Sequence, residues 1–134
     1  MKPPDNKTDR LIGIVGVCAS GKSTLIEGLT ARGYKARHIA QEHSYVKDMW
    51  RRITNPDILI FLDASYEKAC DRRKMDWTMK DYLEQQRRVS HARENADFYL
   101  DTTFLTPESA LDQILAFLEN KEFGHSRSIA PAPK

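Results

Sequence analysis

The sequence predicts an α/β fold with three layers, in which helices cover both faces of a parallel sheet of about four strands. Two apolar runs, residues 11–17 and 58–62, are continuous and contain several β-branched side chains, which is typical of strands buried on both faces of a sheet. Stretches with apolar residues at helical spacing follow these runs, and strands that alternate with helices form βαβ units with right-handed crossovers. We therefore expect parallel strands in the spatial order second, first, third, fourth.

The first half of the chain contains the first strand, a helix and a second strand. Apolar residues recur at helical spacing between residues 22 and 32, and Gly33 is a natural left-handed end for that helix. Residues 34–40 are only moderately apolar and contain basic side chains, so they predict an edge strand. A short amphipathic helix is expected next, and the Asn-Pro-Asp sequence at 55–57 ends it. Its apolar residues are Tyr45, Val46, Met49, Trp50 and Ile53.

The second half adds further helices and the last strand. A helix is expected over residues 65–74, and a longer one begins behind Thr78, with a capping-box pattern, and ends near residue 95. Residues 97–101 form the last short strand. Pro107, preceded by a threonine as N-cap, opens the final helix, whose apolar residues form one stripe.

Composition predicts one small domain. The chain has 134 residues, of which 40% are hydrophobic and 30% are charged, so we expect a single core of ordinary size. This domain is expected to span residues 10–121. Residues 1–9 and 122–134 lack apolar periodicity and are expected to be flexible tails.

Charge and cysteine content narrow the expected partners and compartment. The net charge of +2 is too small to predict a nucleic-acid partner, and no apolar run reaches the length that a membrane span requires. The polar N-terminus resembles no secretory signal, and the two cysteines form no C-x-x-C pair. We therefore expect a cytoplasmic protein that binds neither nucleic acid nor membrane. The oligomeric state is not predicted.

Residues 16–23 read Gly-Val-Cys-Ala-Ser-Gly-Lys-Ser and match the pattern G-x-x-x-x-G-K-[ST] without a mismatch. The pattern lies between a buried strand and an amphipathic helix, where glycines let backbone N–H groups converge on an anion and the helix N-terminus adds its positive end. Lys22 is expected to reach β- and γ-phosphate oxygens, and the Ser23 hydroxyl to bind Mg²⁺. A glycine-rich turn that only caps a helix would not need the lysine, so we predict binding of a nucleoside triphosphate. The residues expected to contact it are Gly16, Cys18, Ala19, Ser20, Gly21, Lys22, Ser23 and Thr24.

Together with this loop, the sequence ILIFLDASYE at 58–67 and the sequence ADFYLDTT at 96–103 carry a family resemblance. The chain resembles P-loop NTPases of the nucleoside monophosphate kinase branch, which includes the small shikimate, gluconate and adenylylsulfate kinases. The resemblance covers most of residues 10–120, and only the loop is a sharp motif. It implies a P-loop NTPase fold, ATP as the nucleotide and Mg²⁺ as the metal cofactor.

The resemblance also implies a lid. In that family, the segment after the strand at 58–62 carries arginines that contact the nucleotide and the transferred phosphate. The arginines of that segment are Arg72, Arg73, Arg87, Arg88 and Arg93. Spacing alone does not choose among them; our candidates are Arg72 and Arg88 for catalysis and Arg73 for nucleotide binding. The adenine slot of the family implies a further nucleotide contact at Thr103.

The chain departs from the family between its second and third strands. A further strand and an acceptor-binding subdomain normally lie there, whereas only residues 41–57 are available. Two acids therefore compete as the Mg²⁺ ligand: Glu42, which follows the second strand, and Asp63, which ends the third. We favour Glu42, because the carboxyl end of its strand would lie beside the phosphate loop. The alternative is a solvated turn in which Ser44 caps the next helix.

These features predict ATP-dependent phosphoryl transfer to a small polar molecule. Lys22 and the lid arginines would neutralise developing charge, while Glu42 or His43 would orient or deprotonate the acceptor hydroxyl. An anionic acceptor would pair with Arg51 or Arg52. The alternative is an ATPase or nucleotide-dependent switch that acts through a protein partner, which the missing acceptor subdomain favours.

Overall fold

The structure is a computed structural model that describes residues 10–17, 19–73 and 77–122, without the side chains of residues 73, 121 and 122. Its strands are β1 (Leu11–Gly16), β2 (Lys35–His38), β3 (Ile58–Asp63) and β4 (Phe98–Asp101). They form one sheet of parallel pairs in the order β2-β1-β3-β4, which confirms the predicted order and the edge position of β2. Of the expected tails at 1–9 and 122–134, only residue 122 is described, and it is the last residue of α6 (Pro107–Glu122); the rest lies outside the described residues.

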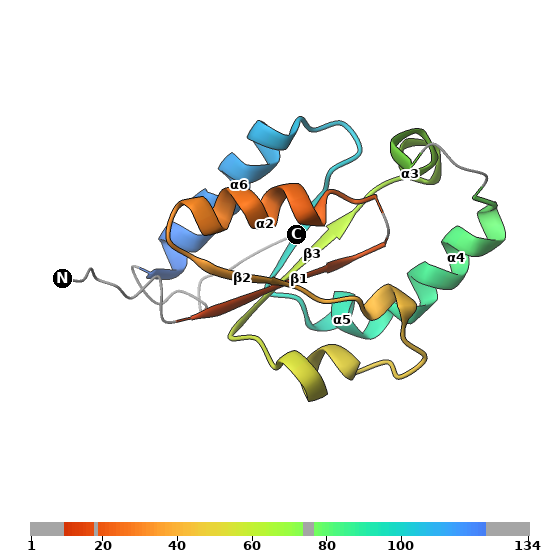
Figure 1. The fold of residues 1–134 in the computed structure, drawn as a ribbon, viewed down its shortest axis with the longest axis horizontal. Coiled ribbons are helices and arrows are strands. Elements are labelled where there is room, and N and C mark those ends of the chain that lie inside the picture. The colour runs from red at the N-terminus through yellow and green to blue at the C-terminus, as the bar shows by residue number, and fades with distance from the viewer. Residues whose placement is uncertain (1–9, 18, 74–76, 123–134) are drawn as a thin grey trace.

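Helices cover both faces of the sheet (Figure 1). The helices α2 (Lys22–Ala31) and α6 (Pro107–Glu122) pack on one face, and α5 (Ser90–Asn95) packs on the other together with η2 (Trp50–Thr54), a turn of π-helix. Successive residues of β1 divide between two hydrophobic cores, because neighbouring side chains of a strand point to opposite faces. Ile12 and Ile14 belong to the first core, and Val15 belongs to the second.

Local signals set two of the helix boundaries. Thr78 and Asp81 form the predicted capping box at the start of α4 (Met79–Arg88), since each side chain accepts a hydrogen bond from the backbone N–H of the other residue. Pro107 begins α6 as expected, and the hydroxyl of Thr106 accepts a hydrogen bond from the first turn of that helix.

The helix expected around residues 45–53 is absent from the described structure. In its place are a short 3-10 helix, η1 (Gln41–His43), and the η2 turn, while Tyr45 is 85% exposed. The reason is the side chain of Gln41, which donates to the carbonyl of Val46 and accepts from the N–H of Trp50. A side chain therefore makes bonds that a continuous helix would make along its backbone.

The long helix expected to follow Thr78 is divided. Val89, with φ −100° and ψ 3°, separates α4 from α5, and its side chain is fully buried in the second core. The helix before it, α3 (Tyr66–Arg73), is close to its predicted span. No helix within the described ranges has the length and apolar character needed to cross a membrane.

Candidate functional site

Residues 16–23 connect β1 to α2 at the carboxyl edge of the sheet. Gly16 has no space for a side chain, because a Cβ atom there would lie 2.1 Å from the carbonyl oxygen of Leu62 on β3. Ala19 (φ 65°) and Gly21 (φ 104°) both have left-handed backbone conformations. The loop therefore turns sharply just before α2, whose N-terminal N–H groups and dipole favour an anion. Cys18 lies outside the described residues.

Lys22, the first residue of α2, folds back into this loop. Its ammonium group donates to the carbonyl oxygens of Gly16 (2.8 Å) and Val17 (3.0 Å) and to Oε2 of Glu42 (3.0 Å). The lysine is only 6% exposed. Because a charge is rarely buried without partners, these three acceptors explain why the ammonium group is tolerated inside the loop.

Glu42 approaches Lys22 from η1, directly beyond β2. It is 2% exposed, and its Oε2 lies 4.0 Å from Nε2 of His38 and 3.7 Å from Nε2 of His43. Burial, followed by the nearby charge of Lys22, lowers the pKa of His38, so this imidazole is neutral at pH 7. An open pocket of about 330 Å³ lies here, which we call the Glu42 pocket. Its lining residues are Ala19, Gly21, Lys22, Ser23, Thr24, His38, Glu42 and His43.

Gln41 holds the segment that carries Glu42. Its fully buried side chain donates to the carbonyl oxygens of Val46 (2.8 Å) and Arg88 (3.2 Å) and accepts from the N–H of Trp50 (2.8 Å). Arg88 on α4 adds a bond from Nη1 to the carbonyl oxygen of Glu42 (3.3 Å). Contacts from α4 and from residues further along the same segment therefore position Glu42.

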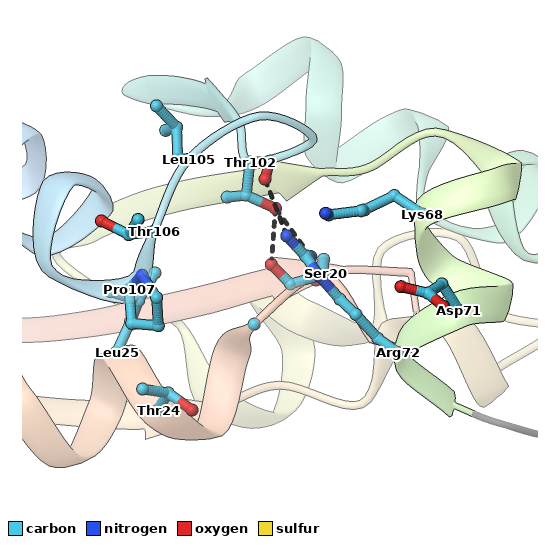
Figure 2. A pocket seen from close by; sticks show the side chains of 11 residues that line it. Ser20, Thr24, Leu25, Lys68, Asp71, Arg72, Thr102, Leu105, Thr106 and Pro107 are labelled. Atoms are coloured by element: carbon cyan, nitrogen blue, oxygen red, sulfur yellow. Dashed lines mark hydrogen bonds between the residues drawn. The ribbon is translucent and has the colours of Figure 1, made fainter.

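A second pocket, of about 370 Å³, lies between the loop, α3 and the segment after β4. We call it the Arg72 pocket. Figure 2 shows Lys68 and Asp71 extending from α3 on one side, with Thr106 and Pro107 on the opposite side. Its lining residues are Ser20, Gly21, Thr24, Leu25, Lys68, Asp71, Arg72, Thr102, Leu105, Thr106 and Pro107.

Arg72 connects this pocket to the loop. Its Nη1 donates to the carbonyl oxygen of Ala19 (2.9 Å) and to Oγ1 of Thr102 (3.1 Å), and its Nη2 donates to the carbonyl oxygen of Thr102 (2.7 Å). The Thr102 hydroxyl also lies 2.9 Å from the carbonyl oxygen of Ser20. Burial lowers the pKa of Arg72, and the charges of Asp101 and Asp71 offset part of this effect. The guanidinium group remains charged.

Asp63, the other acid considered for Mg²⁺, has different contacts. Its Oδ1 accepts from the N–H of Ala64 (2.9 Å) and from Nε2 of Gln86 (3.1 Å), and its Oδ2 accepts from the hydroxyl of Tyr99 (2.6 Å). Burial, followed by this bond, raises the pKa of Tyr99. Of the two acids, the structure therefore brings Glu42 into contact with Lys22.

Thr103 does not line the Arg72 pocket; its neighbour Thr102 does. The Thr103 hydroxyl donates to Oδ1 of Asp101 (2.6 Å) and accepts from the N–H of Ser65 (2.9 Å). These bonds connect the end of β4 to the start of α3. The backbone of Arg73 ends α3, and its side chain falls outside the description.

Several other arginines lie away from the two pockets. Arg51 and Arg52, the expected partners of an anionic acceptor, lie near Asp48 in ion pairs and line neither pocket. Arg87 pairs with Glu84 and is exposed. Arg93 lies over the ring of Tyr99, with 5.0 Å between its guanidinium carbon and the ring centre. By contrast, Arg72 hydrogen-bonds the loop itself, and Arg88 hydrogen-bonds the backbone of Glu42.

His38 and Thr102 were not predicted as site residues, although a signal for both was present. His38 ends β2 and Thr102 follows β4, and ligands of open α/β sheets bind beyond the carboxyl ends of strands. Lys68 and Asp71 had no comparable signal, because charged residues alternate along much of α3.

No known protein-family model matches this chain, and no curated protein is similar to it in sequence. In the part of the chain that the structure describes, no three His, Cys, Asp or Glu side chains are grouped so that they could hold a metal ion. The functional interpretation therefore depends on the geometry of the 16–23 loop and its two pockets.

Proposed function

We propose that this protein has a P-loop NTPase fold, binds ATP with Mg²⁺ at the 16–23 loop and transfers the γ-phosphate to a small polar molecule. The observation that carries the proposal is the position of Lys22, whose ammonium group is buried in the loop 3.0 Å from the carboxylate of Glu42. A turn that only connects a strand to a helix gains nothing from a buried charge, since burial of a charge is costly even when it is paired. The position of the loop after the interior strand β1 supports the fold assignment.

The two pockets would hold the two ends of the nucleotide, its nucleoside and its phosphates. Both are lined by Gly21 and Thr24, so they meet at the start of α2. The Arg72 pocket, about 370 Å³, falls within the usual volume range of small-molecule sites and would take the nucleoside. The phosphates would follow the loop toward the Glu42 pocket. Lys22 would there exchange its bonds to the Gly16 and Val17 carbonyls for phosphate oxygens.

The Glu42 pocket also fits Mg²⁺. The carboxylate of Glu42 and the hydroxyl of Ser23 line it, and oxygen ligands of this kind are what Mg²⁺ prefers. A site with few protein ligands is normal for Mg²⁺, because the ion keeps several waters and binds phosphate oxygens. When bound, the ion would neutralise negative charge on the β- and γ-phosphates.

The acceptor would enter the Glu42 pocket from its open side. His43 is more than half exposed beside Glu42, so its ring nitrogen can accept the proton of an acceptor hydroxyl while Glu42 orients that hydroxyl. Arg88 would hold the Glu42 backbone in place during this step. Arg51 and Arg52 have no part in this arrangement, because they line neither pocket.

One observation favours the alternative, a nucleotide-dependent switch that acts through a protein partner. Tyr45 is 85% exposed and Val46 is 49% exposed, directly after Glu42 and His43. Exposed apolar side chains beside a nucleotide site are suited to a protein contact. The two candidates share nucleotide binding and differ in what stimulates turnover.

Binding of ATP in the presence of Mg²⁺, measured by calorimetry, tests the shared part. Lys22→Met keeps the side-chain volume and removes the charge, so we expect a loss of affinity of about 100-fold. Lys35→Met changes an exposed lysine on β2 and should bind as the parent protein does. The double variant Lys22→Met/Glu42→Gln removes both buried charges. If its circular dichroism spectrum matches that of the parent protein and it still fails to bind ATP, the loss of binding is not caused by a loss of folding. Unchanged affinity in a folded Lys22→Met protein would refute the proposal.

Release of ADP separates the two candidates. A kinase should release ADP at least about tenfold faster when its acceptor is present in a library of small polar molecules. Stimulation by a protein fraction, with none by the small molecules, would instead support the switch.

A further inference from the structure

We infer that Arg72 is a positioning residue which, together with Thr102, holds the 16–23 loop in the shape that receives a polyphosphate. The inference rests on the proposed function, because it concerns how the same loop binds its ligand. The described hydrogen bonds of Arg72 go to two backbone carbonyls and one hydroxyl of the protein itself. The guanidinium group therefore joins the loop to Thr102.

The contacts of Arg72 join three parts of the fold. The residue lies in the last turn of α3 and binds Ala19 in the loop and Thr102 beyond β4. Thr102 is in turn fixed to β3, since its N–H donates to the carbonyl oxygen of Asp63 (2.8 Å). The loop is therefore held against the carboxyl ends of β3 and β4 and not by its own residues alone.

The peptide group between Ala19 and Ser20 explains why this contact matters. Its carbonyl oxygen accepts from Arg72 (2.9 Å), and its N–H donates to the carbonyl oxygen of Val17 (3.2 Å). The same Val17 oxygen accepts from the ammonium group of Lys22 (3.0 Å). Arg72 thus holds the carbonyl oxygen of this peptide group, while the N–H of the same group bonds to the Val17 carbonyl that Lys22 also contacts.

The conformation of Ala19 makes the peptide dependent on outside support. Its φ of 65° is left-handed, which is unfavourable for an L residue with a side chain. Such a conformation persists only where surrounding contacts hold it. The bond from Arg72 to the Ala19 carbonyl is a contact of this kind.

Thr102 acts on the next peptide. Its hydroxyl lies 2.9 Å from the carbonyl oxygen of Ser20. A dashed line marks this contact in Figure 2. The C=O and N–H of a trans peptide point in opposite directions, so this contact turns the N–H of Gly21 away from Thr102. That N–H begins the series of backbone donors at the N-terminus of α2, where phosphate groups bind.

The shape of the guanidinium group separates positioning from charge. Two Nη atoms of Arg72 reach two different carbonyl oxygens, at 2.9 Å and 2.7 Å. A lysine at this position supplies the same charge from one nitrogen and cannot reproduce a planar fork. If Arg72 attracted phosphate only by its charge, a lysine in its place should preserve the affinity. If Arg72 holds the loop, a lysine should not preserve it.

Affinities for inorganic tripolyphosphate and for ATP, measured by calorimetry, test the inference. Tripolyphosphate has no base, so it reports on the loop alone. We expect Arg72→Lys to weaken tripolyphosphate about tenfold and ATP by at least that factor, and Thr102→Val to weaken both ligands by a smaller factor. The affinity of the double variant Arg72→Lys/Thr102→Val should fall by less than the product of the two single-variant factors, because Arg72 also binds the Thr102 hydroxyl. Arg32→Lys, which changes an exposed arginine bound to the Gly28 carbonyl, is the matched control.

Two results would overturn the inference. The first is an Arg72→Lys protein that binds tripolyphosphate as the parent protein does, since the loop would then keep its shape without the planar fork of Arg72. The second uses no ligand: hydrogen exchange of residues 19–24 should be faster in Arg72→Lys than in the parent protein and unchanged in Arg32→Lys. Unchanged exchange in Arg72→Lys would refute the inference whether or not ATP binds, and faster exchange would support it even if the proposed function fails.

Discussion

The two sides of the 16–23 loop are held by different kinds of contact. On one side, the ammonium group of Lys22 meets the carboxylate of Glu42 beside an open pocket. On the other side, Arg72 and Thr102 bind carbonyl oxygens of the loop backbone. Lys22 makes its bonds from the end of a flexible side chain, so its ammonium group can turn from its protein partners to a ligand. Arg72 bonds both to Ala19 and to Thr102, so it joins the loop to another part of the fold. The comparison predicts that a ligand rearranges the Lys22 side and leaves the Arg72 side in place.

The Lys22 side is buried enough for its contacts to matter energetically. Lys22 and Glu42 are 6% and 2% exposed, so neither charge is solvated as it would be on the surface. Removing one member of such a pair costs more than forming the pair gains.

The largest expected effect comes from a substitution that disturbs both sides of the loop at once. Gly16 lies where the loop begins, and a Cβ atom there would meet the carbonyl oxygen of Leu62 at 2.1 Å. Backbone cannot give way as a side chain can, so Gly16→Ala should lower the free energy of unfolding by about 3 kcal/mol. Urea denaturation measures this change.

Gly28→Ala is the matched control for that substitution. Its Cβ atom would lie 2.8 Å from Cδ2 of Leu111, the flexible end of a side chain, and alanine favours the helix. The change in unfolding free energy should stay within about 1 kcal/mol. Equal effects of the two substitutions would show that the contact between the loop and β3 is less rigid than the structure implies.

The second-largest effect should come from a substitution that disturbs only the Lys22 side of the loop. Gln41→Leu removes the bonds to the backbone of Val46, Trp50 and Arg88, and leaves the buried N–H of Trp50 and two partly buried carbonyls without this partner. The free energy of unfolding should fall by about 2 kcal/mol in urea denaturation. Lys47→Ala changes an exposed residue of the same segment and should stay within about 0.5 kcal/mol. A loss from Gln41→Leu as small as that control would mean that α4 alone positions Glu42.

Gln41 also marks where prediction from sequence ends. The strands, their order and the capping box depend on local patterns and simple packing rules, and all were predicted correctly. The segment around Gln41 was predicted as an amphipathic helix because apolar residues recur at the right spacing. In the structure, one buried amide organises that segment through residues up to 47 positions away. No local pattern contains such a contact.

The same distinction applies to the candidate site. The loop residues and Glu42 were predicted because a motif and the carboxyl-edge rule pointed to them. The contact between Arg72 and the loop spans 53 positions in sequence, so spacing indicated only that some arginines of the segment face the loop. Arg51 and Arg52 were proposed from their place in a short segment, and their pairing with Asp48 was not foreseen.

A smaller effect sharpens the view that the Lys22 side exchanges partners. If ATP binds as proposed, the carboxylate of Glu42 should compete with the nucleotide for the ammonium group of Lys22 when Mg²⁺ is absent. Glu42→Gln should therefore strengthen metal-free ATP binding about tenfold, or about 1.4 kcal/mol, and reduce the gain in affinity that Mg²⁺ provides. The ratio of the two affinities, measured with excess EDTA and with Mg²⁺, is the readout.

Glu27→Gln provides the control for the change in total charge, because Glu27 is exposed on α2. Its ratio of affinities should equal that of the parent protein. If Glu42→Gln also leaves the ratio unchanged, Glu42 neither competes for Lys22 nor contacts the metal, and the Lys22 side would be as fixed as the Arg72 side.

The smallest effect concerns the side chain of Ser20. Within the described residues, its fully buried hydroxyl has no hydrogen-bond partner, whereas its carbonyl oxygen lies 2.9 Å from the Thr102 hydroxyl. If the Arg72 side acts only through the backbone, Ser20→Ala leaves that support intact. It should raise the free energy of unfolding by up to about 1 kcal/mol, because a buried hydroxyl without a partner is removed. Its affinity for tripolyphosphate should remain within about twofold of the parent value. A loss of affinity as large as that of Thr102→Val would show that the Ser20 hydroxyl itself receives the ligand. The Arg72 side would then bind the ligand as the Lys22 side does, and would not act only as a support.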